Sequence, residues 1–227
     1  MSPAKPRMKK TSGAGDNAAL KEAVLKAALG DVAADGFTAK VLERAGEAAG
    51  ADREALARLF PDGPLSLVEA FSEACDAEME KRLAKLKLPA MKIRERIRQA
   101  VLARIDASRP HKEAARRAAA FLTLPPHAGL GAKLLYRSVD RMWRAVGDTS
   151  TDFNFYTKRA ILAGVYSSTL MRWFTDDSEG EAATGEFLDR RIENVMQFEK
   201  FKAQMKDRAA GLPSLGDILG ALNVRRG

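Results

Sequence analysis

The stretch "VLERAGEAAGADREALARLFPDGPLSLVEAF", Val41 to Phe71, decides the fold. It starts as a helical run, turns at Gly50, and continues as a short helix over Asp52–Phe60. The sequence "FPDGP" (Phe60–Pro64) predicts a turn, because proline fixes its own φ and glycine permits backbone conformations that other residues avoid. Helical periodicity then resumes over Leu65–Leu86.

The residues before this stretch predict a longer helix. Apolar side chains recur at helical spacing from Leu20 to Val32, and Gly36 is placed to end that helix. Thr38 is placed to cap the next one, which runs to Glu47. A long helix, a glycine-containing turn, a short helix, a second turn and another long helix resemble the helix-turn-helix part of TetR-type regulators. The resemblance is one of architecture.

DNA binding has to be argued from charge, and the charge of this segment is unfavourable. Between Gly36 and Gly63 the cationic residues are Lys40, Arg44, Arg53 and Arg58, and the anionic residues are Glu43, Glu47, Asp52, Glu54 and Asp62, giving 4 − 5 = −1. Neutralisation of phosphates supplies most non-specific affinity for DNA. The acids at the start of the short helix would meet the polyanion where a recognition helix makes its contacts. We therefore expect no nucleic-acid partner, and keep a ligand-responsive DNA-binding regulator as the alternative.

The rest of the chain predicts an all-α fold, because alternating strand patterns do not occur in it. Further helices are predicted at Met91–Ala107, His111–Leu122, Leu130–Gly147, Asp152–Asp176, Gly185–Lys206 and Ser214–Val224. The sequence is divided into a disordered basic tail (1–17), a degenerate helix-turn-helix part (18–88), a lipid-binding and dimerisation part (89–208) and an amphipathic C-terminal helix (212–227). The segments 124–129 and 175–185 are expected to be linkers.

Composition limits where the protein works. The net charge is +8, and four cations among the first ten residues account for half of it. The longest apolar runs fall well short of the roughly 20 residues that span a bilayer. A single cysteine, Cys75, gives no internal disulfide and suits a reducing compartment. We expect a cytoplasmic protein that associates peripherally with the inner face of the membrane.

No set of residues predicts catalysis. The two histidines, His111 and His127, each follow a proline and are interpreted as turn residues. No Glu-x-x-His pair is present to build a di-metal site, and no nucleotide-binding or nucleophile motif occurs. Cys75 is expected to be buried and inert. The sequence predicts no enzyme activity, no cofactor and no metal.

Aromatic side chains concentrate between Asp148 and Ser178, in "DTSTDFNFYTKRAILAGVYSSTLMRWFTDDS". A helix that is apolar on nearly every side must be buried on most faces. Ordinary core, a lipophilic cavity and a protein-binding surface all remain open. With the helices on either side, the segment offers more apolar side chains than a tight bundle needs. The candidate cavity lining is Leu135, Val139, Met142, Trp143, Leu162, Val165, Tyr166, Leu170, Phe187, Ile192 and Met196.

The same segment carries a second resemblance. "STDFNFYTKRAILAGVY" (Ser150–Tyr166), "FLDRRIENVMQF" (Phe187–Phe198) and "LFPDGPLSLVEAF" (Leu59–Phe71) are similar to the Coq-nine-type ubiquinone-biosynthesis accessory proteins, which are lipid-binding relatives of TetR regulators. The resemblance implies a homodimer that does not bind DNA and that holds an isoprenoid quinone precursor or a phospholipid in an apolar pocket.

The resemblance also implies a protein partner, a membrane-bound di-iron hydroxylase that acts on demethoxyubiquinone. The family's docking patch includes an aromatic pair at the start of the aromatic helix, which falls here on Phe155 and Tyr156. Arg159, one turn further, is included with them. The sequence has Phe155 where tryptophan is commoner in the family.

The C-terminal segment has an amphipathic pattern of its own. Leu215, Ile218, Leu219 and Leu222 follow helical spacing, and Arg225 and Arg226 come after them. A helix of about 11 residues is marginal alone in water, so its apolar face needs a partner. Packing against protein is one possibility. A membrane interface is the other, and the resemblance favours it, so these four residues are the predicted membrane contact.

Overall fold

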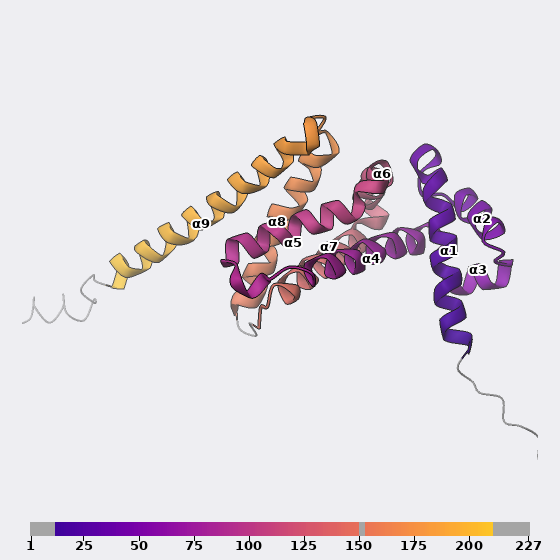
Figure 1. The fold of residues 1–227 in the computed structure, drawn as a ribbon, viewed down its shortest axis with the longest axis horizontal. Coiled ribbons are helices and arrows are strands. Elements are labelled where there is room, and N and C mark those ends of the chain that lie inside the picture. The colour runs from indigo at the N-terminus through magenta and orange to yellow at the C-terminus, as the bar shows by residue number, and fades with distance from the viewer. Residues whose placement is uncertain (1–11, 150–152, 211–227) are drawn as a thin grey trace, which may run out of the picture.

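Residues 12–149 and 153–210 are described by the structure, a computed structural model, and they form helices joined by short turns (Figure 1). The helices are α1 (Ser12–Asp35), α2 (Ala39–Ala48), α3 (Arg53–Leu59), α4 (Pro64–Leu83), α5 (Ile93–Ser108), α6 (Lys112–Thr123), α7 (Ala128–Ala145), α8 (Phe153–Phe174) and α9 (Ala182–Ala210). Short 3-10 turns are η1 (Leu88–Ala90), η2 (Arg109–His111), η3 (Pro125–His127) and η4 (Glu179–Glu181). The part of the chain that is described contains no strand, so the all-α prediction is confirmed.

Helix ends follow the residues that predicted them. The Thr38 hydroxyl accepts a hydrogen bond from the Val41 amide at 3.3 Å, and the Asp52 carboxylate accepts one from the Ala55 amide at 2.7 Å. These side chains satisfy amides that the first turn of a helix leaves free. Gly36 and Gly63 have φ values of +71° and +55°, a region that favours glycine. α1 begins at Ser12, within the segment expected to be a disordered tail.

The three N-terminal helices occupy one end of the molecule, and α4 to α8 form the body (Figure 1). Phe37, between α1 and α2, joins the two parts. Its ring centroid lies 6.2 Å from that of Phe71 on α4 and 6.4 Å from that of Phe121 on α6. One continuous apolar core therefore runs from Val24 to Leu188.

The turn between α8 and α9 is built around Asp176. Its carboxylate accepts hydrogen bonds from the amides and hydroxyls of Ser178 and Thr184, at 2.6 to 3.0 Å. These bonds hold the pKa of Asp176 well below its ordinary value. The expected linker 175–185 therefore contains η4 and the first turn of α9, which begins at Ala182 rather than Gly185.

From this corner α9 packs on α8 and α5 and then extends beyond the body (Figure 1). Arg98 of α5 binds Asp189 of α9 with Nε to Oδ1 at 2.6 Å. Of the helices that the structure describes, none is both long enough and apolar enough to cross a membrane. The predicted membrane contact at Leu215, Ile218, Leu219 and Leu222 lies outside the described residues.

Candidate lipid cavity and docking surface

A cavity of about 320 Å³ lies among α4, α5, α6, α7 and α8. Its apolar walls come from α4, α6, α7 and α8, including Phe71, Leu122, Leu135 and Leu170, whereas α5 contributes the polar side chains of Arg104 and Ser108. Small side chains make the space: α6 contributes Ala115, Ala118 and Ala119. Gly131 of α7 lets that helix approach α6 closely, since a Cβ there would lie 3.1 Å from the Leu122 carbonyl oxygen.

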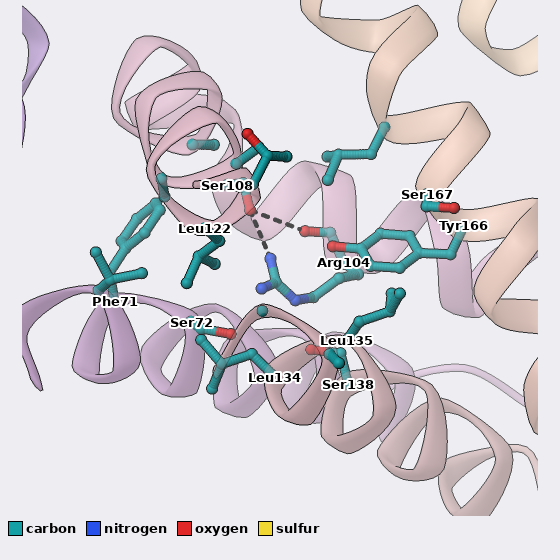
Figure 2. A pocket seen from close by; sticks show the side chains of 18 of the residues that line it. Phe71, Ser72, Arg104, Ser108, Leu122, Leu134, Leu135, Ser138, Tyr166 and Ser167 are labelled. Carbon is teal, nitrogen blue, oxygen red and sulfur yellow. Dashed lines mark hydrogen bonds between the residues drawn. The ribbon is translucent and has the colours of Figure 1, made fainter. Parts of the chain in front are cut away.

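The cavity has a polar end (Figure 2). The Arg104 guanidinium donates from Nε to Asp76 Oδ1 at 2.7 Å and from Nη1 to Ser108 Oγ at 2.6 Å. Ser138 donates to the same Asp76 oxygen at 2.7 Å. Asp76 and Arg104 are 0% and 6% exposed, so the ion pair is buried among α4, α5 and α7. Burying two charges is costly unless they are paired and hydrogen-bonded, as these are.

The ionisation of this end is set by its surroundings. Burial raises the pKa of Tyr166, so its hydroxyl stays protonated at neutral pH and keeps its hydrogen. Burial alone would lower the pKa of Arg104, but its surroundings, among them the Asp76 carboxylate that accepts its hydrogen bond, outweigh burial and raise that pKa above the ordinary value. The polar end therefore contains a permanent cation beside a neutral phenol.

Three of the eleven residues predicted to line a lipid cavity line this one: Leu135, Tyr166 and Leu170. Four others lie in the core: Val139, Met142, Trp143 and Leu162. Val165 lines a separate groove between α8 and α9, and Phe187 borders a depression on α9. Ile192 and Met196 lie half-buried on α9. Helical periodicity identifies an inward face, but it does not tell whether an inward side chain meets a neighbour or a space.

Sequence reasoning missed the contributions of α4, α5 and α6 to the cavity. Val68, Arg104 and Ala118 are among the lining residues that these three helices provide. The run "EAARRAAAF" (113–121) carried a signal, because alanines facing a core made of larger side chains leave room beside them. Arg104 gave no signal of its own, since its partner Asp76 lies on another helix.

The predicted docking pair lies at the start of α8. Tyr156 is 67% exposed and Phe155 is half-buried, and their rings meet edge to face with centroids 5.1 Å apart. Their position agrees with an accessible aromatic surface.

Arg159 does not share that surface, because only 3% of it is exposed. Its Nε donates to Asp140 at 2.7 Å, its Nη1 donates to the Phe155 carbonyl at 3.1 Å, and its Cζ lies 3.4 Å from the centroid of the Phe155 ring. The prediction that Arg159 is a contact residue is corrected on this point: Arg159 fixes Phe155 in place from beneath.

The structure places His127 and Cys75, for which no chemistry was expected, against other side chains. His127 stacks on Phe121 with ring centroids 4.1 Å apart, and Cys75 is 4% exposed. Within the described ranges, no cluster of three or more His, Cys, Asp or Glu side chains is placed to hold a metal.

One of the four cations between Gly36 and Gly63, Arg44, forms ion pairs within the protein. Arg44 pairs with Asp31 at 2.8 Å and also with Asp35, both on α1. This pairing raises the pKa of Arg44 and lowers that of Asp35.

Comparisons with known proteins show which proteins this chain is similar to. Residues 128–199 match the family model named COQ9. The chain is 33% identical over 200 residues to the rat (Rattus norvegicus) protein named ubiquinone biosynthesis protein COQ9, mitochondrial, and this match covers 85% of this chain and 64% of that protein. The human protein of the same name is 32% identical, with 85% and 63% covered. COQ9-B of Xenopus laevis is 35% identical over 185 residues, with 78% and 62% covered.

A solved structure shows the same fold. The TetR transcriptional regulator from Nitrosomonas europaea superposes with a TM-score of 0.63 at 17% identity, covering 79% of this chain and 99% of the regulator. This similarity confirms the predicted TetR-like fold and, at that identity, speaks for the fold alone. The chain spans about 64% of the length of the rat relative. The family match, the relatives and the fold agree with one another, and over most of its length this chain is similar to proteins of the COQ9 family.

Proposed function

We propose that this chain is a lipid-binding accessory protein of ubiquinone biosynthesis. It holds an isoprenoid quinone precursor or a phospholipid and presents substrate to a membrane-bound di-iron demethoxyubiquinone hydroxylase. The observation that carries the proposal is the apolar cavity among α4 to α8, together with the names of the relatives. Exposing a hydrocarbon chain to water costs about 0.8 kcal/mol per CH₂, so an apolar wall lowers the cost of drawing a lipid out of a bilayer.

Filling the cavity should weaken lipid binding. Ala119 is half-buried and lines the cavity, so Ala119→Phe should reduce the lipid that copurifies by about tenfold, equivalent to roughly 1.4 kcal/mol of affinity. Native mass spectrometry and analysis of extracted lipid measure the change. Ala120→Phe is the matched control, because Ala120 is exposed and does not line the cavity. Full lipid content in Ala119→Phe would show that the lipid lies elsewhere.

The docking surface can be tested separately. Tyr156→Lys should leave lipid content unchanged and weaken binding of the hydroxylase about thirtyfold, since an aromatic hot spot contributes roughly 2 kcal/mol. Surface plasmon resonance with the purified hydroxylase gives the affinity. Tyr136→Lys, at a tyrosine on α7 that is 47% exposed, serves as the control. Equal affinity of both variants and the unmodified protein would remove Tyr156 from the docking surface.

The groove between α8 and α9 suggests a second copy of this chain as a further partner. Val165, Val195 and Phe198 line it, and Phe198 and Phe201 are exposed to about the same degree as Tyr156. We propose that two copies pair here and that the dimer sits peripherally at a membrane surface. Light scattering measures the mass in solution, and a monomer at micromolar concentration would contradict the pairing.

A ligand-responsive transcriptional regulator is the second candidate, favoured by the fold it shares with the Nitrosomonas europaea protein. Against it stand the net charge of −1 over the segment from Gly36 to Gly63 and the internal pairing of Arg44. Gel-shift titration discriminates the two. Tight duplex binding that weakens steeply with salt would favour the regulator.

A further inference from the structure

The basic segment (residues 81–98), which joins α4 to α5, carries a large share of the charge of the chain. It contains eight cationic side chains and one acidic side chain, a net charge of 8 − 1 = +7, whereas the whole chain has a net charge of +8. The cations are Lys81, Arg82, Lys85, Lys87, Lys92, Arg94, Arg96 and Arg98, and the acid is Glu95. The cavity and the docking pair leave this segment without a role.

Most of these cations are not neutralised by the protein. Arg82 pairs with Glu78 at 2.9 Å, and Arg98 pairs with Asp189 at 2.6 Å. Five others make no ion pair with an acid in the described ranges and are exposed: Lys81, Lys85, Lys87, Lys92 and Arg94. The carboxylate of Glu95 accepts a hydrogen bond from a backbone amide at the start of α5. The surface is therefore strongly cationic.

The stability of the two helices does not account for this charge. Lys81 lies in the last turn of α4, where the helix dipole favours a cation. Lys87 lies beyond the end of α4, and Lys92 and Arg94 lie at the start of α5, where the dipole disfavours cations. A partner outside the chain would give these cations a use.

Apolar side chains alternate with the cations in "KLKLPAMKIR", residues 85–94. Leu86 and Ile93 are 37% and 49% exposed, unlike Leu88, which is buried in the core. An anionic bilayer fits both kinds of side chain, because cations meet lipid phosphates while apolar side chains enter the interface beneath them. The phosphates of a nucleic acid would use the cations alone and leave Leu86 and Ile93 in water.

The basic segment is fixed against the end of α7. Arg96 donates through Nε to the Met91 carbonyl at 2.9 Å, through Nη2 to the Pro89 carbonyl at 3.0 Å and through Nη1 to the Val146 carbonyl at 3.2 Å. The start of α8 lies at this same end of the body, away from α1 to α3 (Figure 1). A membrane on this side would therefore bring a membrane-bound partner toward the exposed Tyr156.

We propose that the basic segment binds the surface of an anionic lipid bilayer. Its cations contact the lipid phosphates, and Leu86 and Ile93 enter the interface between them. The inference rests on the proposed function, whose peripheral membrane contact it assigns to a named face of the chain. This face is separate from the contact predicted for Leu215 to Leu222.

The test measures co-sedimentation of the full chain with vesicles. Lys85→Gln/Lys87→Gln should weaken binding about thirtyfold to vesicles with roughly two parts phosphatidylcholine to one part phosphatidylglycerol, the effect of removing two cations from an anionic surface. The loss should shrink at high salt, which screens the remaining attraction. Lys40→Gln/Arg53→Gln is the matched control, because it removes the same charge from exposed positions on α2 and α3 and should bind like the unmodified chain.

The apolar contribution has its own variant. Ile93→Ser should weaken vesicle binding about fivefold, since an apolar side chain no longer enters the interface. Binding to a duplex DNA probe is measured for the same variants. Duplex binding that is as tight as vesicle binding and does not respond to Ile93→Ser would assign the surface to nucleic acid and overturn the proposal.

The remaining outcomes separate this surface from the proposed function. Unchanged vesicle binding by Lys85→Gln/Lys87→Gln, or equal losses in both charge variants, would overturn the role of the basic segment. Failure of the unmodified chain to bind vesicles would do the same. Lipid that copurifies with the chain and its affinity for the hydroxylase are measured in parallel. If both are normal, only the membrane surface is rejected, and if both are absent from the unmodified chain, the proposed function fails.

Discussion

Arg104→Leu should destabilise the protein by about 3–5 kcal/mol, the cost of leaving a buried charge without its partner. Asp76 would remain fully buried and would lose the donor that lies 2.7 Å from its carboxylate. Ser138 would still donate to it, and Arg137 would remain 3.8 Å away, but neither replaces the charge-assisted hydrogen bond. Urea unfolding followed by circular dichroism measures the loss.

The double variant Asp76→Leu/Arg104→Leu is the control for this result. It leaves no buried charge, so it should be more stable than Arg104→Leu alone despite carrying two changes. The single variant Asp76→Leu completes the comparison. If the losses of stability in the two single variants simply add in the double variant, the ion pair does not stabilise the protein, and the effect of Arg104→Leu comes from lost packing.

Trp173→Ala should cost about 3–5 kcal/mol, as expected for removing a large side chain from a closed core. Trp173 is fully buried near the end of α8, and its indole Nε1 donates to Glu181 Oε2 at 2.6 Å. The ammonium of Lys112 lies 5.3 Å from the ring centroid. Removal of the ring therefore empties part of the core and loosens the corner that directs α9. Thermal and urea unfolding both measure the effect.

Trp173→Phe separates the ring from its hydrogen bond. Most of the buried area stays, so this variant should lose much less stability than Trp173→Ala. Glu181 still binds Arg109 and Lys112, which limits the cost of losing the indole donor. A cost below about 1 kcal/mol for Trp173→Ala would contradict tight packing at this corner.

Local chemistry made the fold predictable from the sequence. Thr38 caps the helix that it was expected to cap, the short helix begins beside Asp52 as expected, and Gly36 and Gly63 occupy positions with positive φ. These effects act over three or four residues, so the local sequence is enough to predict where the helix begins or ends. The start of α9 was placed three residues late because the Asp176 hydrogen bonds span the turn and have no periodic pattern.

The cavity was much less predictable, because it depends on several helices at once. Leu135 and Val139 lie one turn apart on α7, yet one lines the cavity and the other is fully buried in the core. Arg159 appeared available to a partner, but Asp140 on α7 and Asp148 after it bind its guanidinium. Which residue meets a space, a charge or solvent is decided by distant segments of the chain.

The Asp52 cap stabilises α3 by a hydrogen bond that does not depend on the charge of the carboxylate. Its carboxylate supports α3 through the Ala55 amide, but serine performs that task about as well and carries no charge. Glu54, in the first turn of the same helix, makes no described ion pair and could equally be cationic. The three-helix scaffold therefore does not require an acidic face. The fold of these three helices can be kept while substitutions at Asp52 and Glu54 change the sign of the surface potential.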